Sequence, residues 1–157
     1  MNFRRAVERV PDLRGALRPG LKALRAQDRP HVAPEDPRRL RGSVDVDAAL
    51  RPRHPHAHRW DFAIGYRHSN LNRDFIYWVE MHTATDRQVK VVLEKLSWLK
   101  GWLAGDGCEL RTPDSEFVWV SSGATTFTLS APQRKEFAQS GLYHRGQVFR
   151  IPLARPR

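Results

Sequence analysis

Two acidic residues, Asp61 and Glu80, lie in segments that the sequence predicts to be the strands of a β-hairpin. Residues 60–66 (WDFAIGY) and 75–82 (FIYWVEMH) are rich in β-branched and aromatic residues, and the polar stretch between them is typical of a turn. If the large apolar side chains share one face, the matching register places Asp61 beside Glu80. Two neighbouring carboxylates can hold a divalent ion such as Mg²⁺ or Mn²⁺.

Two further residues could assist such a site. His82 is two residues beyond Glu80 and therefore on the same side of the strand, where a neutral imidazole can accept a proton or bind metal. Lys95 is on the helix predicted to follow, and its ammonium group would supply a positive charge. Metal-assisted phosphodiester cleavage uses hard oxygen ligands and a group that handles the proton of water. The candidate site is therefore Asp61 and Glu80 as metal ligands, with His82 or Lys95 as the auxiliary group.

This arrangement resembles the PD-(D/E)XK nuclease superfamily in part, over about residues 43–121. That superfamily builds its site from an Asp at the start of one central strand and a Glu-x-Lys at the end of the next, followed by a helix and a further strand. Asp61 matches the first position, and Glu80-Met81-His82 matches the second with histidine in place of lysine. Some members carry the positive group on the following helix, where Lys95 lies. The resemblance implies a restriction-endonuclease-like core, a divalent ion, and DNA or RNA as substrate.

Other interpretations of the acidic residues remain open. Asp61 and Glu80 could lie on a solvated sheet face and form ordinary ion pairs. The arginines near enough in sequence for this are Arg59, Arg67 and Arg73. Asp45 and Asp47, from the preceding predicted strand, could add a ligand or simply be solvated.

Three histidines alternate in a proline-containing loop: His54, His56 and His58. An extended loop of this kind could bind a transition metal. A dedicated metal site usually takes its ligands from separate elements, so a solvated loop is the favoured interpretation.

The remaining elements indicate an α/β or α+β fold with a mixed central sheet, a β-hairpin followed by a long helix, and further strands. A helix is expected over residues 86–104, begun by a capping box of Thr85 and Gln88. Other expected elements are a strand over 43–50, strands over 117–121 and 125–129, a short helix capped by Ser130 and Gln133 and ending at Gly141, and a last strand over 147–153.

The first part of the chain differs in composition from the rest. The net charge is +10, and residues 1–60 carry 14 Lys/Arg against 7 Asp/Glu together with seven of the eleven prolines. We expect a basic N-terminal helical arm and linker over residues 1–41 and a single α/β domain over residues 42–157. A basic surface favours nucleic acid as a partner. Arginine exceeds lysine by 22 to 5, however, and this excess can also reflect a GC-rich genome.

A non-catalytic module is the alternative function. Trp98 and Trp102 are one turn apart on helix 86–104, and this stripe could dock on a protein partner or a second copy, with the arginine-rich arm binding nucleic acid or protein. Aromatic residues at helical spacing belong more often to the core, which is the other interpretation of these two residues. The single cysteine, Cys108, allows no intrachain disulfide and fits a cytoplasmic setting. No stretch resembles a signal peptide or a membrane span, so no membrane partner is expected.

Overall fold

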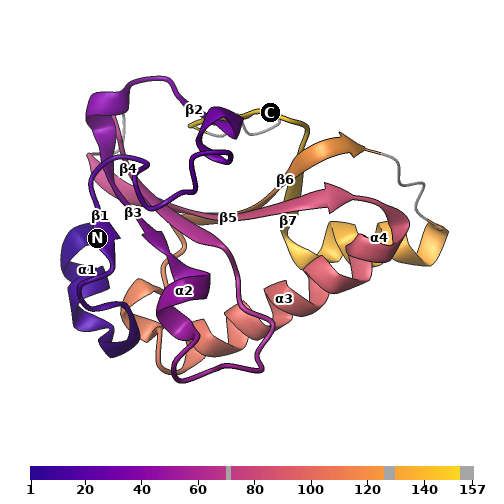
Figure 1. Cartoon of the computed structure of the whole chain (residues 1–157), viewed down its shortest axis with the longest axis horizontal. Coiled ribbons are helices and arrows are strands. Elements are labelled where there is room, and N and C mark those ends of the chain that lie inside the picture. Colours follow the sequence, from indigo (N-terminus) through magenta and orange to yellow (C-terminus); the bar gives the residue numbers. More distant parts are fainter. Residues whose placement is uncertain (70–71, 126–129, 153–157) are drawn as a thin grey trace.

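The computed structural model describes residues 1–69, 72–125 and 130–152 of the chain (Figure 1). In this part of the chain a six-stranded mixed sheet has the strand order β1-β3-β4-β5-β6-β7. The antiparallel strands are β1 (Leu17–Arg18), β3 (Leu40–Asp45), β4 (Phe62–His68) and β5 (Arg73–Ala84). The strands β6 (Ser115–Thr125) and β7 (Leu142–Arg145) continue the sheet in parallel with β5. The α+β class with a mixed sheet, a hairpin and a long helix is confirmed.

The α-helices cover one face of the sheet (Figure 1). The α-helices are α1 (Phe3–Arg9), α2 (Val46–Leu50), α3 (Asp86–Ala104) and α4 (Ala131–Ser140), and the 3₁₀ helices are η1 (Pro11–Leu13), η2 (Arg29–His31), η3 (Pro37–Arg39) and η4 (Cys108–Leu110). Trp78 and Trp119 are fully buried in the core between this layer and the sheet. None of the helices in the described residues is long and apolar enough to cross a membrane.

The opposite face of the sheet is covered by chain from both ends of the sequence. The strand β2 (Val32–Pro34) pairs in parallel with β8 (Phe149–Ile151), above the sheet in Figure 1. Leu24 and Phe149 are buried here, and the Phe149 ring meets Tyr77 of β5 edge to face, with 5.4 Å between centroids. Residues 1–41, expected to be an arm and linker, thus supply α1, β1 and β2 and bury side chains in both cores.

The hairpin of β4 and β5 follows the predicted alternation of side chains. Phe62, Ile64 and Tyr66 pack toward the layer formed by β2 and β8. Gly65 faces the helices, where a Cβ atom would lie 2.2 Å from the ring of Phe3. A small residue is required at this position because α1 packs directly against the strand.

Two predicted strands differ from those observed. The strand expected over residues 43–50 ends at Asp45, whose carboxylate accepts a hydrogen bond from the Ala48 amide (2.9 Å) and caps α2. The alternation of valine and aspartate over residues 44–47 is compatible with both a strand and the start of a helix, so the pattern did not mark this boundary. The turn expected between 121 and 125 does not end the strand, because β6 spans Ser115–Thr125, but its register with β5 shifts at this place: His82 pairs with Ser121 and Ala84 with Thr125. Residues 126–129 of the other expected strand lie outside the described residues.

The two helices predicted after the hairpin have the expected bounds, but only one of their two predicted caps forms. Helix α3 spans the expected residues, but within the described structure the Thr85 side chain makes no capping hydrogen bond. The capping box of Ser130 and Gln133 does form, and α4 ends at Gly141 in a left-handed conformation (φ 80°). The last strand is shorter than predicted and covers Phe149–Ile151.

Asp74 joins helix α1 to the hairpin. Its buried carboxylate accepts hydrogen bonds from the Phe3 amide (2.8 Å) and from Nε of Arg67 (2.7 Å), and Nε of Arg41 lies 3.6 Å away. These contacts satisfy one of the free amides of the first helical turn with a negative charge.

Replacing Asp74 with alanine should lower the free energy of unfolding by about 3–5 kcal/mol, because Arg67 and the Phe3 amide lose a buried charged partner. Urea denaturation measures this loss. The matched control is Glu109→Gln, which removes a solvent-exposed pair with Arg9 (4.0 Å) and should cost less than about 1 kcal/mol. Equal losses in the two variants would contradict the anchoring role of Asp74.

Candidate functional site

The two acidic residues meet at the start of β4 and near the end of β5. Tyr66 pairs with Phe75 and Phe62 with Val79, so the predicted register is confirmed and Asp61 lies beside Glu80. Glu80 is fully buried, and Asp61 is partly exposed. The Met81 amide donates a hydrogen bond to Oδ2 of Asp61 (2.9 Å), and the two carboxyl groups are hydrogen-bonded to each other.

Lys95 reaches this acidic pair from helix α3. Its Nζ atom lies 2.6 Å from Oε1 and 3.2 Å from Oε2 of Glu80. Buried residues of α3, among them Val92 and Leu96, hold the helix against the sheet. Because Lys95 lies three residues from Val92 and next to Leu96, this packing turns its side chain toward the strand that carries Glu80.

Burial and mutual repulsion shift the ionisation of the acidic pair. Burial raises the pKa of Glu80 well above its ordinary value, and the Asp61 charge adds to the rise, while Lys95 opposes it. Burial also raises the pKa of Asp61, against the opposing effects of Lys95, the Met81 amide and the hydrogen bond to Glu80. Two carboxylates face one lysine, so the pair retains a proton more readily than separate carboxyl groups do.

His82 is near the pair but is not part of the hydrogen-bonded group. It is partly buried, and burial followed by the charge of Lys95 lowers its pKa, so the neutral imidazole is favoured. Its main-chain carbonyl accepts a hydrogen bond from Nε1 of Trp119 (3.0 Å). Among the described residues, His82 does not form a closely spaced three-ligand group with Asp61 and Glu80.

In the described part of the chain, Asp61 and Glu80 do not form the surface ion pairs with nearby arginines that the alternative interpretation expected. The three arginines considered as partners of the acidic pair are each bound to another carboxylate: Arg59 to Asp47 (2.9 Å), Arg67 to Asp74 (2.7 Å) and Arg73 to Asp114 (2.9 Å). Asp45 caps α2, and Asp47 also pairs with Arg51 (2.8 Å). Both are therefore engaged away from the acidic pair.

The tryptophan stripe of α3 belongs to the interior. Trp102 is 6% exposed and meets Trp78 edge to face, with 6.3 Å between centroids. Trp98 is partly buried and contacts the ring of His54 at 5.3 Å. The stripe is therefore not an open docking face.

Sequence reasoning missed Arg25, whose charge also lowers the pKa of Asp61. Arg25 follows Leu24, which is buried against the hairpin, and the nearby Ala23 amide donates to Oγ of Ser43 (3.1 Å). These contacts bring an N-terminal segment without periodic pattern to the site. No local sequence signal marks this approach.

A second polar pair was also missed on the same face of the sheet. Ser121 of β6 is opposite His82 in the register, and its Oγ atom lies 2.7 Å from Nε2 of His144 on β7. Burial lowers the pKa of His144. Polar groups therefore extend from β5 across β6 to β7.

Searches of family models, curated proteins and solved structures found no match to this chain. Function is therefore inferred from the site itself. Its components are two close carboxyl groups with raised pKa values, a lysine bonded to the more buried one, and a neutral histidine nearby. Such perturbed groups mark a candidate site for metal binding or proton transfer.

The raised pKa of Glu80 makes stability depend on pH. An acid that holds its proton more tightly in the folded state destabilises that state as pH rises above its unfolded pKa. Glu80→Gln removes this effect, so the variant should gain stability relative to the parent protein as pH rises from about 5 to 8. Urea denaturation of metal-free protein across this range measures the difference. A difference that stays constant or shrinks with pH would show that Glu80 ionises normally.

Proposed function

We propose that the chain is a metal-dependent nuclease-like domain of the PD-(D/E)XK type, which hydrolyses phosphodiester bonds in DNA or RNA. The observation that carries the proposal is the contact of Lys95 Nζ, at 2.6 Å, with a buried Glu80 that is hydrogen-bonded to Asp61. The element order also supports it, because the hairpin of β4 and β5 is followed by α3 and the parallel strand β6. Lysine on the helix takes the place of the lysine missing at position 82.

The residues at the site fit a magnesium or manganese ion. Proteins commonly hold Mg²⁺ through one or two carboxylates, with waters and substrate phosphates completing the coordination. Asp61 and Glu80 supply two carboxylates, and their raised pKa values show that Lys95 alone does not offset the cost of ionising both. When bound, the ion would polarise the scissile phosphate and lower the pKa of an attacking water.

Each protein group has a definite role in this proposal. Asp61 and Glu80 would hold the ion, and the Met81 amide orients the Asp61 carboxylate (2.9 Å). Lys95 orients Glu80 and places a positive charge where negative charge develops on phosphate. His82, which is neutral, accepts the proton of the attacking water.

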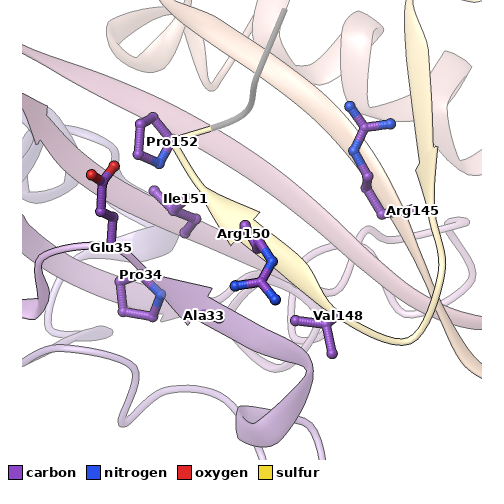
Figure 2. Close-up of a pocket in the computed structure, with 8 residues that line it drawn as sticks. All are labelled: Ala33, Pro34, Glu35, Arg145, Val148, Arg150, Ile151 and Pro152. Atoms are coloured by element: carbon purple, nitrogen blue, oxygen red, sulfur yellow. The ribbon is translucent and has the colours of Figure 1, made fainter.

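Phosphate contacts away from the acidic pair would come from a pocket beside β7. The pocket has a volume of about 530 Å³, and Figure 2 shows Arg150 over its middle, Arg145 at the β7 end and Glu35 at the opposite end. Arg145 pairs with Val120 of β6, which pairs with Met81 of β5, so this arginine is two strands from the acidic pair. Val120 and Met81 pack toward β2 and β8, so the pocket lies on the face of the sheet opposite to the one where Glu80 meets Lys95. Two guanidinium groups suit a phosphate backbone that follows this edge of the sheet.

Part of the basic charge in the N-terminal segment has a structural use instead. Several of its arginines donate to main-chain carbonyls, as Arg4 does to Arg41 (3.0 Å) and Arg29 to Leu24 (3.1 Å). These contacts hold irregular chain in place. The pocket arginines are therefore better candidates for nucleic-acid contacts than the N-terminal segment as a whole.

Substitutions in the acidic pair and Lys95 test the proposed reaction. Asp61→Asn, Glu80→Gln and Lys95→Ala should each reduce Mn²⁺- or Mg²⁺-dependent cleavage of DNA or RNA by about 10²-fold or more, because each removes a group that stabilises the transition state. Single-turnover cleavage of labelled DNA and RNA measures the loss.

The matched control is Lys100→Ala on the same helix, where Lys100 donates to the Ser140 carbonyl, and cleavage should be unchanged. Nucleic-acid binding without cleavage in the parent protein would favour the non-catalytic module. Cleavage that persists in all three site variants would exclude this site as the catalytic centre.

The pocket arginines should contribute to affinity through charge. Replacing both Arg145 and Arg150 with alanine should weaken binding to duplex DNA and reduce the slope of log affinity against log salt by about 2, since each phosphate contact contributes about 0.9. Fluorescence anisotropy across a salt series measures both quantities. The control is replacement of Arg9, at the end of α1, and Arg51, which follows α2. This change removes the same charge from the other end of the sheet. An equal effect in this control would show that only net charge matters.

A further inference from the structure

We propose a second metal site, selective for a Zn²⁺-like divalent transition metal, formed by Asp12, His54 and Asp106. One ligand atom from each residue lies within 4.8 Å of the others. The three come from separate elements: Asp12 from η1, His54 from the loop after α2, and Asp106 from the turn after α3. Ligands drawn from separate elements are typical of dedicated metal sites.

The second observation is that polar atoms are buried at this place without a partner. The Asp12 side chain is 3% exposed, and within the described residues its Oδ2 atom has no hydrogen-bond partner. The same holds for Nε2 of His54, which lies 3.7 Å from that oxygen. A buried carboxylate oxygen and a buried imidazole nitrogen normally have partners, because leaving them unpaired is costly.

The separation of these atoms suits an ion between them. The 3.7 Å between Oδ2 of Asp12 and Nε2 of His54 is too long for a hydrogen bond. Two ligand atoms of one tetrahedral zinc ion are about 3.4 Å apart when each bond to the metal is about 2.1 Å. Asp106 would supply the third ligand: its side chain is 54% exposed, and its Oδ2 atom lies 3.6 Å from the Arg53 guanidinium, a solvent-exposed pair that an ion would have to displace or share. One imidazole with two carboxylates is a mixed nitrogen and oxygen set that suits Zn²⁺, Mn²⁺ or Co²⁺ better than Mg²⁺ or Ca²⁺.

The surroundings hold the ligands as supporting residues do in metal sites. Arg53 donates to the other Asp12 oxygen, Oδ1 (3.0 Å), and leaves Oδ2 for the ion. The ring of His54 rests edge-on against Trp98, and the His54 amide donates to the Leu50 carbonyl (2.9 Å). Hydrogen-bonded carboxylate ligands and fixed imidazole rings are the usual outer shell of a bound metal.

The site is separate from the acidic pair and does not depend on the proposed nuclease function. Lys95 and Ala104 are both on α3, nine residues apart, which corresponds to about 13 Å along the helix axis. An ion here would connect η1, the loop after α2 and the end of α3. Its expected effect is on the stability of that junction.

The test uses full-length protein with Asp61→Asn, Glu80→Gln and Cys108→Ser, so that the acidic pair and the exposed thiol do not bind the probe. After treatment with a chelator, Zn²⁺ is titrated by calorimetry and Co²⁺ by visible absorption. We expect one equivalent of bound metal and a higher melting temperature with Zn²⁺. Adding His54→Ala or Asp106→Asn should weaken zinc binding by about 10- to 100-fold or more. Loss of a residue that only supports a metal ligand already costs that much, and these variants remove a ligand itself.

The matched control is His58→Ala, which removes an exposed histidine of the same loop, paired with Glu94 at 3.9 Å, and should leave zinc binding unchanged. Asp106→Asn is the decisive variant because this exposed turn residue can change without loss of folding, which circular dichroism verifies. Absence of bound zinc in the starting protein overturns the proposal. Zinc affinity in the His54 and Asp106 variants that equals the affinity of the starting protein also overturns the proposal. The residues would then be an ordinary cluster of Asp12, Arg53 and His54.

Discussion

Burial of two carboxyl groups against a single lysine is the constraint on which the candidate chemistry depends. Glu80 is in a central strand between β4 and β6 and is fully buried, so its ionised form needs compensation. Lys95 provides part of this, and the pKa values of Glu80 and Asp61 remain raised. Well-packed apolar residues are often at least as stable as a buried ion pair. Stability alone therefore gives no reason for this cluster, whereas the proposed binding of a cation would.

The arrangement around the pair depends on two layers that pack against opposite faces of the sheet. Helix α3 presents Lys95 to Glu80 because Val92 and Leu96 hold it on one face. The segment that carries Arg25 is held on the other face by Leu24. Asp61, just before β4, is influenced by charges from both layers. The N-terminal part of the chain thus takes part in both the core and the electrostatics of the site.

The sequence predicted the centre of the fold better than its periphery. Alternation of large apolar residues in β4 and β5 determined the register, because a slip of one residue would have exposed one whole apolar set. Lys95 was recognised as a candidate donor, but its direction depends on how α3 rotates against the sheet, which only packing decides. The strands β1 and β2 have two and three residues and pair with partners distant in sequence, so no periodic pattern could reveal them.

In the proposed nuclease-like site, position 82 can be a histidine because the positive charge comes from Lys95 on helix α3. A lysine on β5 would place a second ammonium group close to Lys95, on the same side of the strand as Glu80. Repulsion between the two cations would then oppose the contact that now orients Glu80. Lys95 already contributes to lowering the pKa of His82. In the proposed site this effect keeps the imidazole neutral, so the same lysine both binds the acidic pair and prepares its neighbour to accept a proton.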